Sequence, residues 1–399
     1  MRQGVVYCGK GAGVRNRRCG TTVYERHLFA TKKGMNRYQI ALASIKQNPR
    51  TWLITGVAGF IGSNLMECLL SLGQAVVGLD NFSTGHPQNL DEALERGAID
   101  ARFRMIYGDT RDLSVCKEAC SGVDIVLHQA AIGSVPRSID DPIENNAANV
   151  DGFMNMLVAA RNSKVQRFVY ASSCAVYGND PALPKREERI GEALSPYAAT
   201  KLVNEIYAGV FSRVYGLETV GLRYFNIFGR RQDPQGAYAA VIPRWVSTML
   251  KGAACTIRGD GETTRDFCHV DNVVQANILA ATIEDTSATN EIYNVGCGER
   301  TSLNQLFTVI RERLGEKREI SVPAPVYEPF SPGDVRHSLA DITKIRDRLG
   351  YTPIRTIWEG IGEAIGWYMA NDTPTKAQRK VNIDATSAPI LNLNFPPNT

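Results

Sequence analysis

A glycine-rich turn between an apolar strand and an apolar helix restricts the fold of this chain more than any other feature. The strand Thr51–Thr55 runs directly into Gly56-Val-Ala-Gly59-Phe-Ile-Gly62, and a helix-period segment continues to Leu72. Glycines let the backbone turn sharply and approach a ligand, and a helix N-terminus presents unpaired N–H groups with a partial positive charge. The turn therefore predicts a phosphate cradle in an α/β fold rather than a purely structural loop.

Strand-like and helical segments alternate after this turn. Short apolar runs rich in β-branched and aromatic residues predict strands at 51–55, 75–80, 102–107, 124–129, 168–171 and 219–224. Apolar positions with a helical period predict helices at 36–48, 60–72, 145–161 and 197–214. This alternation indicates an α/β fold with a doubly wound parallel sheet, the Rossmann arrangement, with helices on both faces.

The 399 residues divide into four predicted parts. Residues 1–34 carry eight basic side chains and one acid without apolar periodicity, so we expect a basic extension that is disordered or not native, with Met35 as an alternative start. Residues 35–225 are expected to form the Rossmann domain. Residues 226–372 are interrupted by Gly and Pro and are expected to form mainly a smaller α/β substrate-binding lobe. A loose tail is expected at 373–399.

Composition and charge argue against several classes of protein. The whole chain has a net charge of +4, but residues 35–399 carry 37 basic and 40 acidic residues. The positive charge therefore comes from residues 1–34 and does not indicate a nucleic-acid partner. No apolar run approaches the roughly 18 residues that a membrane span requires. Nine scattered cysteines without a CxxC pair predict reduced thiols and a cytoplasmic location. Cys116 and Cys120 are expected to pack within a helix rather than to bind a metal.

An acidic residue ends the second predicted strand. Asp80 follows Gly62 by 18 residues, and a carboxylate there accepts hydrogen bonds from ribose hydroxyls and repels a 2′-phosphate. We therefore expect NAD as the cofactor in preference to NADP. The segments Gly108-Asp109-Thr110 and His128-Gln129-Ala130-Ala131 follow the next two strands and are expected to face the same crevice, with His128 itself as a packed structural residue.

A Tyr-Lys pair opens the helix after the fifth predicted strand. Tyr197 and Lys201 lie four residues apart and so share one helical face, where a solvated surface pair is the alternative interpretation. A nearby ammonium and an oxidised nicotinamide ring would both lower the pKa of the phenol and let it act as a base. Ser173 lies 24 residues earlier, at the end of the fifth strand, where its hydroxyl is expected to bridge phenol and substrate. Cys174 has no orienting base, which disfavours thiol catalysis.

These motifs resemble the extended short-chain dehydrogenase/reductases, and most closely the UDP-N-acetylglucosamine 4-epimerases of bacterial surface-polysaccharide pathways. The resemblance extends from about Met35 to Ala370 and rests on the segments LITGVAGFIGSN, GLDNFSTGH, HQAAIGSVPRSIDDP, SPYAATK, GLRYFNIFGRRQDPQGAYAAVIPRW, GDGETTRDF and GDVRHSLADI.

The resemblance implies a set of site residues. Beside the turn glycines Gly56, Gly59 and Gly62, it implies NAD contacts from Phe60, Ile61, Asp80, Asn81, Ser83, Thr84, Gly85, Asp109, Thr110, Gln129, Ala130, Ala131 and Asn149. It places around the nicotinamide end Tyr197, Lys201, Tyr224, Phe225 and Ile227. It assigns catalysis to Ser173, Tyr197 and Lys201. It assigns the nucleotide sugar to Ser134, Arg137, Ser173, Tyr197, Asn226, Ala240, Val241, Trp245, Arg265 and Ser338.

The implied reaction is the reversible C4 epimerisation of a UDP-N-acetylhexosamine, UDP-GlcNAc with UDP-GalNAc or the corresponding uronic acids, through a 4-keto intermediate and transient reduction of bound NAD. Ser338 stands where narrower glucose/galactose epimerases often carry a bulky aromatic residue, so room is left for an N-acetyl group. Ser331 replaces the usual phosphate-binding Arg, and one phosphate contact is therefore expected to be missing. The resemblance also implies a homodimer through helices 145–161 and 197–214, and it implies no metal.

Two alternative functions share parts of this pattern. UDP-glucuronate decarboxylases and sugar 4,6-dehydratases use the same scaffold, but a dehydratase needs an acid pair beside the serine, where this chain has Cys174 and Ala175. A non-catalytic NAD-binding protein would be expected to lose Tyr197 or Lys201, and both are present.

Overall fold

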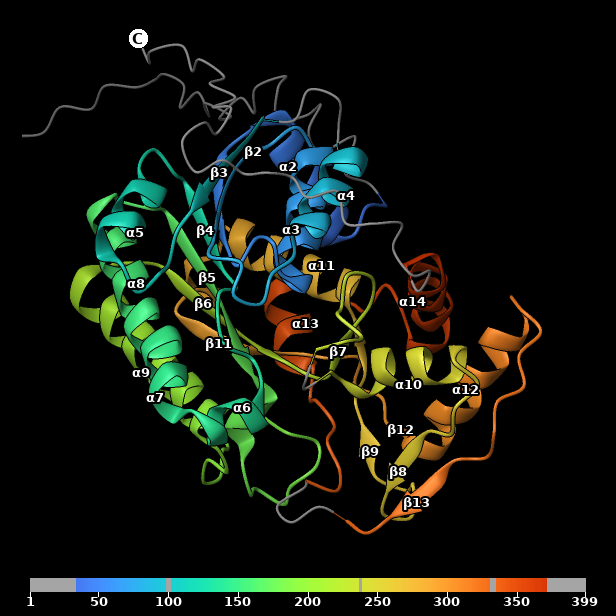
Figure 1. Ribbon diagram of the computed structural model, residues 1–399. Helices are drawn as coiled ribbons and strands as arrows, with labels where there is room; N and C mark the ends of the chain where they lie inside the picture. The colour runs from blue at the N-terminus through green and yellow to red at the C-terminus, as the bar shows by residue number, and fades with distance from the viewer. Residues whose placement is uncertain (1–33, 98–101, 237–238, 331–334, 372–399) are drawn as a thin grey trace, which may run out of the picture. The chain divides into compact units, whose positions relative to one another are not determined.

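Seven parallel strands form the central sheet of the computed structural model, which describes residues 34–97, 102–236, 239–330 and 335–371 (Figure 1). The strands lie in the order β11-β6-β5-β4-β1-β2-β3. Their bounds are β1 Thr51–Thr55, β2 Ala75–Asp80, β3 Arg102–Tyr107, β4 Ile125–His128, β5 Arg167–Ser173, β6 Thr219–Tyr224 and β11 Glu291–Val295. Strand order proceeds in opposite directions from the adjacent β1 and β4, so the predicted doubly wound sheet is confirmed, with its topological switch point there.

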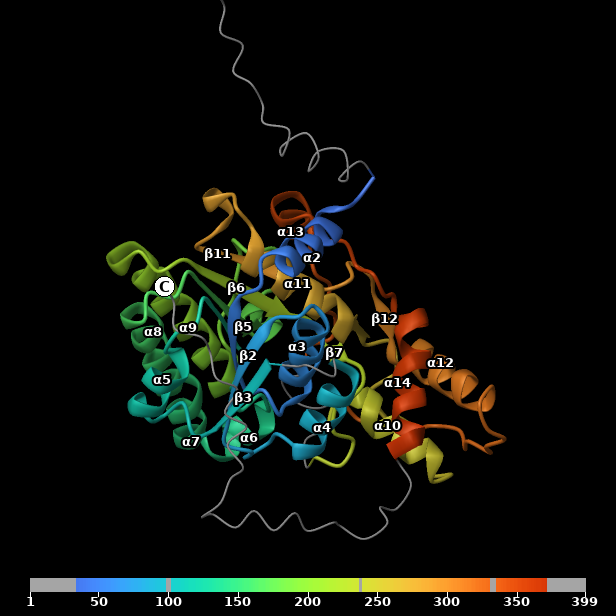
Figure 2. The same ribbon diagram turned by 90° about the horizontal axis from the view of Figure 1, so that it is seen from above.

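Helices cover both faces of this sheet (Figure 2). One layer contains α2, α3, α4 and α11, and the other contains α5, α8 and α9. Their bounds are α2 Arg37–Gln47, α3 Phe60–Ser71, α4 Pro87–Gly97, α5 Leu113–Cys120, α8 Gly152–Asn162, α9 Pro196–Tyr215 and α11 Val270–Thr282. Shorter helices connect or flank these layers at α6 Val135–Asp140, α7 Pro142–Asn146, α13 Thr343–Leu349, and the 3-10 turns Cys174–Tyr177 and Thr286–Ala288.

Alternate residues of each strand point to opposite faces of the sheet. In β1, Trp52 and Ile54 join the core that includes α3 and α11, whereas Leu53 joins the core that includes α8 and α9. Both faces are therefore buried, and the strands appear in the sequence as continuous apolar runs. This is why β1, β2 and β6 have the predicted bounds and why β4 and β5 differ from prediction by only one or two residues at each end. The edge strand β3 also has its predicted bounds, although Arg102, Arg104 and Tyr107 are exposed.

Two elements of the C-terminal part of the chain, α11 and β11, belong to the central sheet and its helix layers. Helix α11 packs on the α3 side, and β11 pairs in parallel with β6 as an edge strand. Both elements lie within the stretch predicted to form mainly the substrate lobe. The described residues from Arg37 to Asn371 form one compact unit by their contacts, and the sheet includes residues beyond position 225. The boundary between the two expected domains stays a prediction.

Helices α10 (Val241–Leu250), α12 (Leu303–Gly315) and α14 (Ile357–Asn371) build the rest of the lobe. Their apolar faces meet in a separate core that includes Trp245 and Phe307. Two-stranded sheets β7–β10, β9–β12 and β8–β13 lie beside them. Their bounds are β7 Ile227–Phe228, β8 Thr256–Arg258, β9 Thr264–Arg265, β10 Cys268–His269, β12 Thr301–Ser302 and β13 Val326–Glu328.

The helix predicted at 145–161 is interrupted by a π-helical turn. Residues Ala147–Asp151 form this turn between α7 and α8. It contains the buried Asn149, whose Oδ1 accepts a hydrogen bond from Ile132 N at 2.8 Å and whose Nδ2 donates to Thr200 Oγ1 at 3.2 Å. Such turns are frequent at functional sites because they redirect a side chain without ending the helix. Helical periodicity predicted the helix but could not locate this turn.

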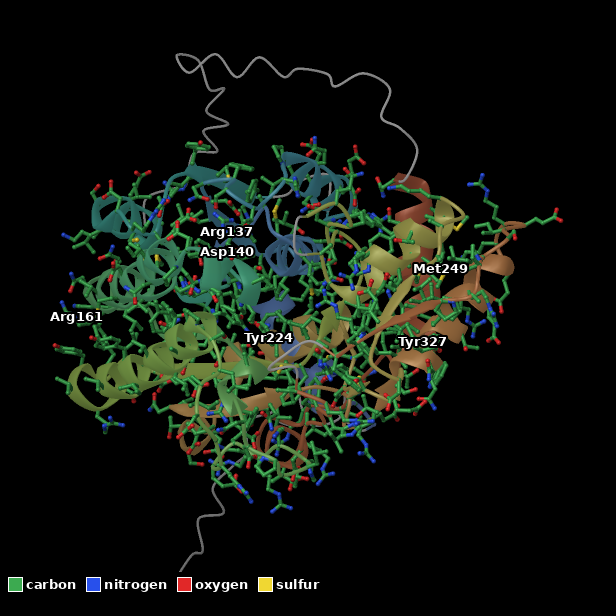
Figure 3. All side chains as sticks on the ribbon, turned by 60° about the horizontal axis from the view of Figure 1, so that its bottom comes forward. Arg137, Asp140, Arg161, Tyr224, Met249 and Tyr327 are labelled. Carbon is green, nitrogen blue, oxygen red and sulfur yellow. The ribbon has the colours of Figure 1, made fainter. Side chains whose placement is uncertain are left out.

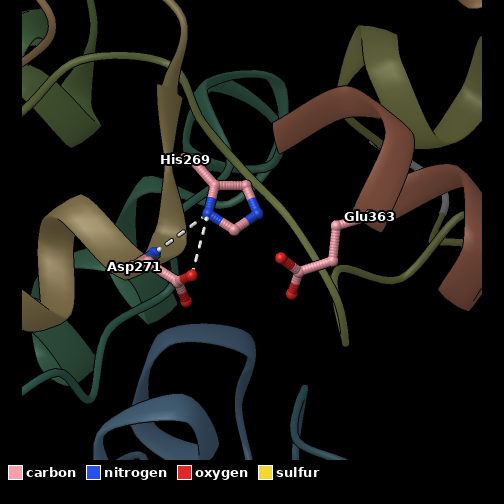
Figure 4. A group of neighbouring side chains, drawn as sticks. All are labelled: His269, Asp271 and Glu363. Atoms are coloured by element: carbon pink, nitrogen blue, oxygen red, sulfur yellow. Dashed lines mark hydrogen bonds and ion pairs between the residues drawn. The ribbon is translucent and has the colours of Figure 1, made fainter. Parts of the chain in front are cut away.

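A cluster of charged side chains joins α11 to α14. Atoms of His269, Asp271 and Glu363 lie within 4.8 Å of one another (Figure 4), and these residue types are possible metal ligands. However, Arg230 lies 3.3 Å from Asp271 and 2.9 Å from Glu363, and Arg355 lies 3.6 Å from Asp271. Two guanidinium groups thus already balance the two carboxylates. We interpret the cluster as an ion-pair network that fastens the two helices together.

Other sequence predictions can be compared with the structure at this point. Cys116 and Cys120 are fully buried in α5, as expected for helix packing. Within the described ranges, a helix with both the length and the apolar character needed to cross a bilayer is not found. The predictions for residues 1–33, Ser331 and the tail at 373–399 fall outside the described residues.

Candidate functional site

A cavity of about 350 Å³ opens where β1, β2, β3 and β4 end. Fifteen of the residues predicted to contact the cofactor line it, namely Gly56, Gly59, Phe60, Ile61, Gly62, Asp80, Asn81, Ser83, Thr84, Gly85, Asp109, Thr110, Gln129, Ala130 and Ala131. The turn after β1 and the segments after the next three strands meet there because the carboxyl ends of parallel strands share one edge of a sheet.

The turn after β1 brings backbone close to the cavity. Gly56 has a φ of +67°, in the left-handed region that favours glycine. A Cβ on Gly62 would lie 2.1 Å from the Gly56 carbonyl oxygen, so α3 can pack on the turn only with glycine at that position. Gly59 is the N-cap of α3 and provides no side-chain cap for the first N–H groups of the helix. These N–H groups and the helix dipole suit the pyrophosphate of a dinucleotide.

Asp80 lies in the same cavity at the end of β2. Its Oδ2 accepts a hydrogen bond from Ala58 N and its Oδ1 accepts one from Phe82 N, each at 2.8 Å. Burial raises the pKa of Asp80, and these two hydrogen bonds oppose the rise. A carboxylate oxygen has two lone pairs, so each oxygen retains one for a ribose hydroxyl. The free acceptor positions of Asp80 therefore fit the ribose hydroxyls of NAD.

The cavity also contains a cation that the sequence analysis did not predict. Arg111 lies 2.7 Å from Asp109, and this pairing lowers the pKa of Asp109 to about 2. Because its charge is balanced by Asp109, Arg111 does not argue for a 2′-phosphate. Other lining residues that sequence reasoning missed are Leu79, Ile132, Gly133, Glu144 and Ala148. Leu79, Ile132 and Gly133 lie in the segments GLDNFSTGH and HQAAIGSVPRSIDDP, which carried the family resemblance, but were not singled out. Glu144 lies in α7 and Ala148 in the π-helical turn, where no motif marks them.

Tyr197, Ser173 and Lys201 meet at the end of β5. Helix α9 begins with Pro196, and its N-cap Ser195 accepts a hydrogen bond from the backbone, which fixes the first turn. The Tyr197 hydroxyl is hydrogen-bonded to Ser173. Lys201 Nζ lies 5.8 Å from the centroid of the Tyr197 ring and donates to Ala171 O at 2.9 Å. The structure thus brings together the three side chains predicted to carry catalysis.

Burial has the largest effect on the pKa values of Tyr197 and Lys201. It raises the pKa of Tyr197 to about 12, against the hydrogen bond from Ser173. It lowers the pKa of Lys201 to about 8, against the attraction of Glu205. The expectation that neighbouring groups lower the pKa of the phenol is therefore not met by the protein's own groups, because loss of hydration outweighs them. Phenolate formation at neutral pH requires further positive charge beside the ring.

His128 is a structural residue, as expected. Its ring is buried between Phe153 and Phe168, and its Nδ1 is hydrogen-bonded to Thr55 Oγ1 at 2.9 Å. Burial, and then the charge of Lys201, lower the pKa of His128 to about 3. The imidazole is therefore neutral at physiological pH.

A second cavity, of about 440 Å³, lies in the C-terminal lobe. Four residues predicted to hold the nucleotide sugar line it, namely Asn226, Val241, Trp245 and Arg265. Sequence reasoning missed Arg244, Thr248, Ala254, Thr256, Arg258, Thr263, Phe267, Leu303 and Glu328. The helical spacing of 241, 244, 245 and 248 was a signal that could have found two of these. Three guanidinium groups against one carboxylate suit a diphosphate anion.

The sheet order relates the two cavities to the catalytic residues. Gln129 follows β4 and lines the first cavity, whereas Asn226 follows β6 and lines the second. Strand β5, which ends in Ser173, lies between β4 and β6. Tyr224, labelled in Figure 3, bridges the two sides because its hydroxyl donates to Gln129 Oε1 at 3.1 Å. The predicted reacting groups therefore lie between the cofactor cavity and the cavity lined by the three arginines.

The remaining predicted site residues lie elsewhere. Phe225 is fully buried against Tyr177, so only its backbone could reach a ligand. Ser134 caps α6, and Arg137 of that helix, labelled in Figure 3, is ion-paired with Glu144 at 2.8 Å. The following predicted site residues line neither cavity: Ser134, Arg137, Asn149, Ser173, Tyr197, Lys201, Ala240, Tyr224, Phe225, Ile227 and Ser338. Their assigned ligand contacts stay predictions.

Comparison with known proteins gives a consistent assignment. The family model described as the NAD dependent epimerase/dehydratase family matches residues 52–296. The UDP-glucose 4-epimerase of Mycolicibacterium smegmatis is 36% identical over 318 residues, covering 79% of this chain and 97% of that protein.

Two solved structures extend the likeness to the fold. The UDP-N-acetylglucosamine 4-epimerase from Methanobrevibacter ruminantium M1, in complex with UDP-N-acetylmuramic acid, is 35% identical with a TM-score of 0.74, covering 81% of this chain and 99% of that one. The UDP-glucose 4-epimerase of Thermotoga maritima, with UDP-glucose, is 34% identical with a TM-score of 0.72, covering 80% and 99%. This chain belongs to the NAD dependent epimerase/dehydratase family.

Proposed function

We propose that this chain interconverts UDP-N-acetylhexosamines at C4, UDP-GlcNAc with UDP-GalNAc or the corresponding uronic acids, through a 4-keto intermediate. That it is an NAD-dependent UDP-sugar 4-epimerase follows from its family and relatives; the acetamido sugar is the part that we propose. One observation carries the proposal of chemistry: the hydrogen-bonded Tyr197 and Ser173, with Lys201 beside them, lie at the end of the strand between the two cavities.

Each catalytic side chain has a role that follows from its position. Tyr197 takes the proton from the sugar 4-hydroxyl as hydride leaves C4, and returns it after the ring has turned. Ser173 shares a hydrogen bond with that phenol and orients it. Lys201 keeps a positive charge near the phenolate, which lowers the cost of ionising a buried phenol. NAD, when bound, supplies the reversible hydride acceptor.

The nucleotide end of the substrate is proposed to occupy the second cavity. Arg244, Arg258 and Arg265 surround it, and guanidinium groups bind phosphate oxygens in a bidentate manner. Anchoring the diphosphate there leaves the hexose free to rotate about its link, so that either face of the 4-keto sugar can be presented. This rotation is what makes an inversion possible with one fixed base.

Ser338 supports the choice of an acetamido sugar. Its backbone N donates to Thr264 O at 3.1 Å, and Ala340 N donates to Asp266 Oδ2 at 3.2 Å. The segment that carries Ser338 therefore runs alongside the strand that carries Arg265. A small hydroxymethyl group at this position leaves space beside the hexose that an aromatic ring would fill.

Replacing Ser338 by Tyr is expected to narrow the substrate range. The value of kcat/KM for UDP-GlcNAc should fall by roughly 100-fold, because the ring occupies the space of the N-acetyl group, while turnover of UDP-glucose is retained. Ser338→Ala is the matched control and should leave the ratio of the two activities unchanged. Equal losses for both sugars in the Tyr variant would show that Ser338 does not select the substrate.

The rate should decline above about pH 8. Lys201 must be cationic to stabilise the phenolate, and burial lowers its pKa to about 8, so it loses its proton as the pH rises through that value. The folded state then binds fewer protons at this group than the unfolded state up to about pH 10.4, and this group's contribution to stability rises with pH. Loss of the Lys201 proton is therefore expected to lower the rate without unfolding the protein. A pH profile of kcat beside thermal unfolding at each pH tests this.

The substrate itself is decided by a direct assay. The purified chain is incubated in turn with UDP-GlcNAc, UDP-GalNAc, UDP-glucose and the uronic acids of the acetamido sugars, and the anomeric protons are followed by NMR. We expect an equilibrium mixture of the two C4 epimers from an acetamido sugar. Turnover of UDP-glucose with no change in any acetamido substrate would contradict the proposed specificity.

We also propose that the chain forms a homodimer through the helices at 145–161 and 197–214, beside which α6 and α7 pack. Exposed apolar side chains on α6, α7 and α9 support this, since large apolar groups at the surface favour a protein partner. They are Ile139, Ile143, Ile206, Tyr207, Val214 and Tyr215.

A further inference from the structure

A third polar side chain, Glu205, lies on the face of α9 that carries Tyr197 and Lys201. The three residues follow one another at intervals of four, which places them on successive turns of one face. The Glu205 side chain is only 6% exposed. A carboxylate with so little access to water costs stability unless it is paired and hydrogen-bonded. Its partners therefore show what the charge is used for.

Glu205 is paired with Arg223 of β6. Arg223 Nε donates to Glu205 Oε1 at 2.9 Å and Nη2 donates to Oε2 at 2.8 Å, a bidentate arrangement in which both groups are buried. Arg223 directly precedes Tyr224 and lies opposite Ser172 in the β5–β6 register. The pair therefore joins the helix of the catalytic residues to β6, which lies beside the end of β5.

The same carboxylate also holds the end of β5. Ser172 Oγ donates to Glu205 Oε1 at 2.6 Å. Consequently the last three residues of β5 each bind a different turn of α9: Ala171 to Lys201, Ser172 to Glu205 and Ser173 to Tyr197. Glu205 makes the middle contact of the three, and its pair with Arg223 keeps this contact in place.

Glu205 acts on Lys201 by charge as well as by position. Its carboxylate favours the ammonium form of Lys201, against burial. The other groups that face Lys201 are Tyr197 on its own helix and the neutral His128 of β4, and Arg223 of β6 offsets part of the Glu205 charge. Removing the Glu205 charge leaves Arg223 uncompensated near Lys201, which disfavours the ammonium further.

We propose that Glu205, paired with Arg223, is a positioning residue of the epimerase reaction, which sets the distance between the Ser173 hydroxyl and the Tyr197 phenol and keeps Lys201 charged. The inference rests on the proposed function for its kinetic readouts. It assigns no contact between Glu205 and either substrate or cofactor.

The test compares Glu205→Gln with the wild-type chain. Glutamine keeps the shape but loses the charge, so we expect kcat to fall by about 10-fold to 100-fold with little change in KM, because a misplaced catalytic group slows the chemical step. The alkaline decline of kcat should also move to lower pH. A variant that was damaged only in stability would lose activity in proportion to its folded fraction and would keep the wild-type pH profile.

A matched control is present in the same two strands. Arg167 at the start of β5 and Glu218 just before β6 form an ion pair at 2.6 Å, at the end of the strands remote from Ser173. Glu218→Gln removes the same kind of carboxylate and is expected to leave kcat and the pH profile unchanged. Equal kinetic losses in both variants would overturn the proposal.

A second variant keeps the proposal testable if Glu205→Gln does not fold. Ser172→Ala removes only the hydrogen bond between the strand end and Glu205, and leaves the ion pair intact. We expect a fall in kcat of several-fold without a change in the pH profile, because charge and position are separated in this variant. Wild-type kcat in both Ser172→Ala and a folded Glu205→Gln would overturn the positioning role.

A crystal structure of the Glu205→Gln variant is the readout that needs no turnover. We expect the Ser172 hydroxyl and the Lys201 ammonium to be displaced, and the hydrogen bond between Ser173 and Tyr197 to lengthen. Should the wild-type chain epimerise no UDP-sugar, the proposed function would fail, while this comparison would still decide the positioning. An unchanged arrangement of all three contacts would contradict it.

Discussion

Replacing Tyr197 by Phe lowers kcat by about 10³-fold or more, while the purified variant retains its NAD. The substitution removes the one hydroxyl that is hydrogen-bonded to Ser173 and leaves the ring that Lys201 faces. Packing and the cofactor cavity should therefore survive, since Tyr197 does not line that cavity. The measurement is kcat by NMR of the anomeric protons, with NAD content determined on the denatured protein.

Tyr293→Phe is a suitable control for the loss of a buried phenol. Tyr293 of β11 in the central sheet is fully buried, and its hydroxyl donates to Ala288 O at 2.7 Å. The control should lose about 1 kcal/mol of stability and keep its kcat. If Tyr197→Phe turned over substrate at the rate of this control, Tyr197 would not be the base.

Replacing Gly62 by Ala weakens NAD binding by about 100-fold, which corresponds to about 3 kcal/mol. The added Cβ would lie 2.1 Å from Gly56 O and 2.8 Å from Val57 Cα, and both are backbone atoms that cannot move aside alone. Helix α3 must therefore shift away from the turn, and its N-terminal N–H groups then leave the position that suits a pyrophosphate. Calorimetric titration of cofactor-free protein with NAD measures the effect.

Gly362→Ala provides the comparison for this variant. Gly362 lies within α14, and a Cβ there would meet no atom within 4 Å. The change should leave NAD affinity unaltered and raise stability by about 0.5 to 1 kcal/mol, because Ala is the better helix former. Equal NAD affinities of the wild-type chain and Gly62→Ala would mean that the close packing of α3 on the turn is not needed for binding.

The inner strands of the central sheet could be predicted because they are buried on both faces. Such strands are recognised from local sequence because most of their residues are apolar or small, and β2 and β6 were predicted with their observed bounds although they contain Asp80 and Arg223. The edge strand β11 was not among the predicted strands. It is interrupted in the sequence by the polar Asn294, whose amide is satisfied by Tyr177, Lys185 and Asp341, residues far away in the chain.

The candidate site was predictable to a different extent in its two halves. The dinucleotide cavity is built from short segments directly after strands, so a local motif identifies most of its lining. The second cavity is lined by one face of α10 and by short strands from distant parts of the chain. Arg258 and Glu328 come together there only because β8 pairs with β13.

The turn after β1, the acid after β2 and the Tyr-Lys spacing on α9 could be predicted from the chain alone, because each depends on neighbours within a few turns of backbone. The protonation of Tyr197 and Lys201 and their support by Glu205 follow only from the folded arrangement. Desolvation depends on which segments exclude water from the site, and the Glu205–Arg223 pair joins residues that only the packing of α9 against β6 brings together.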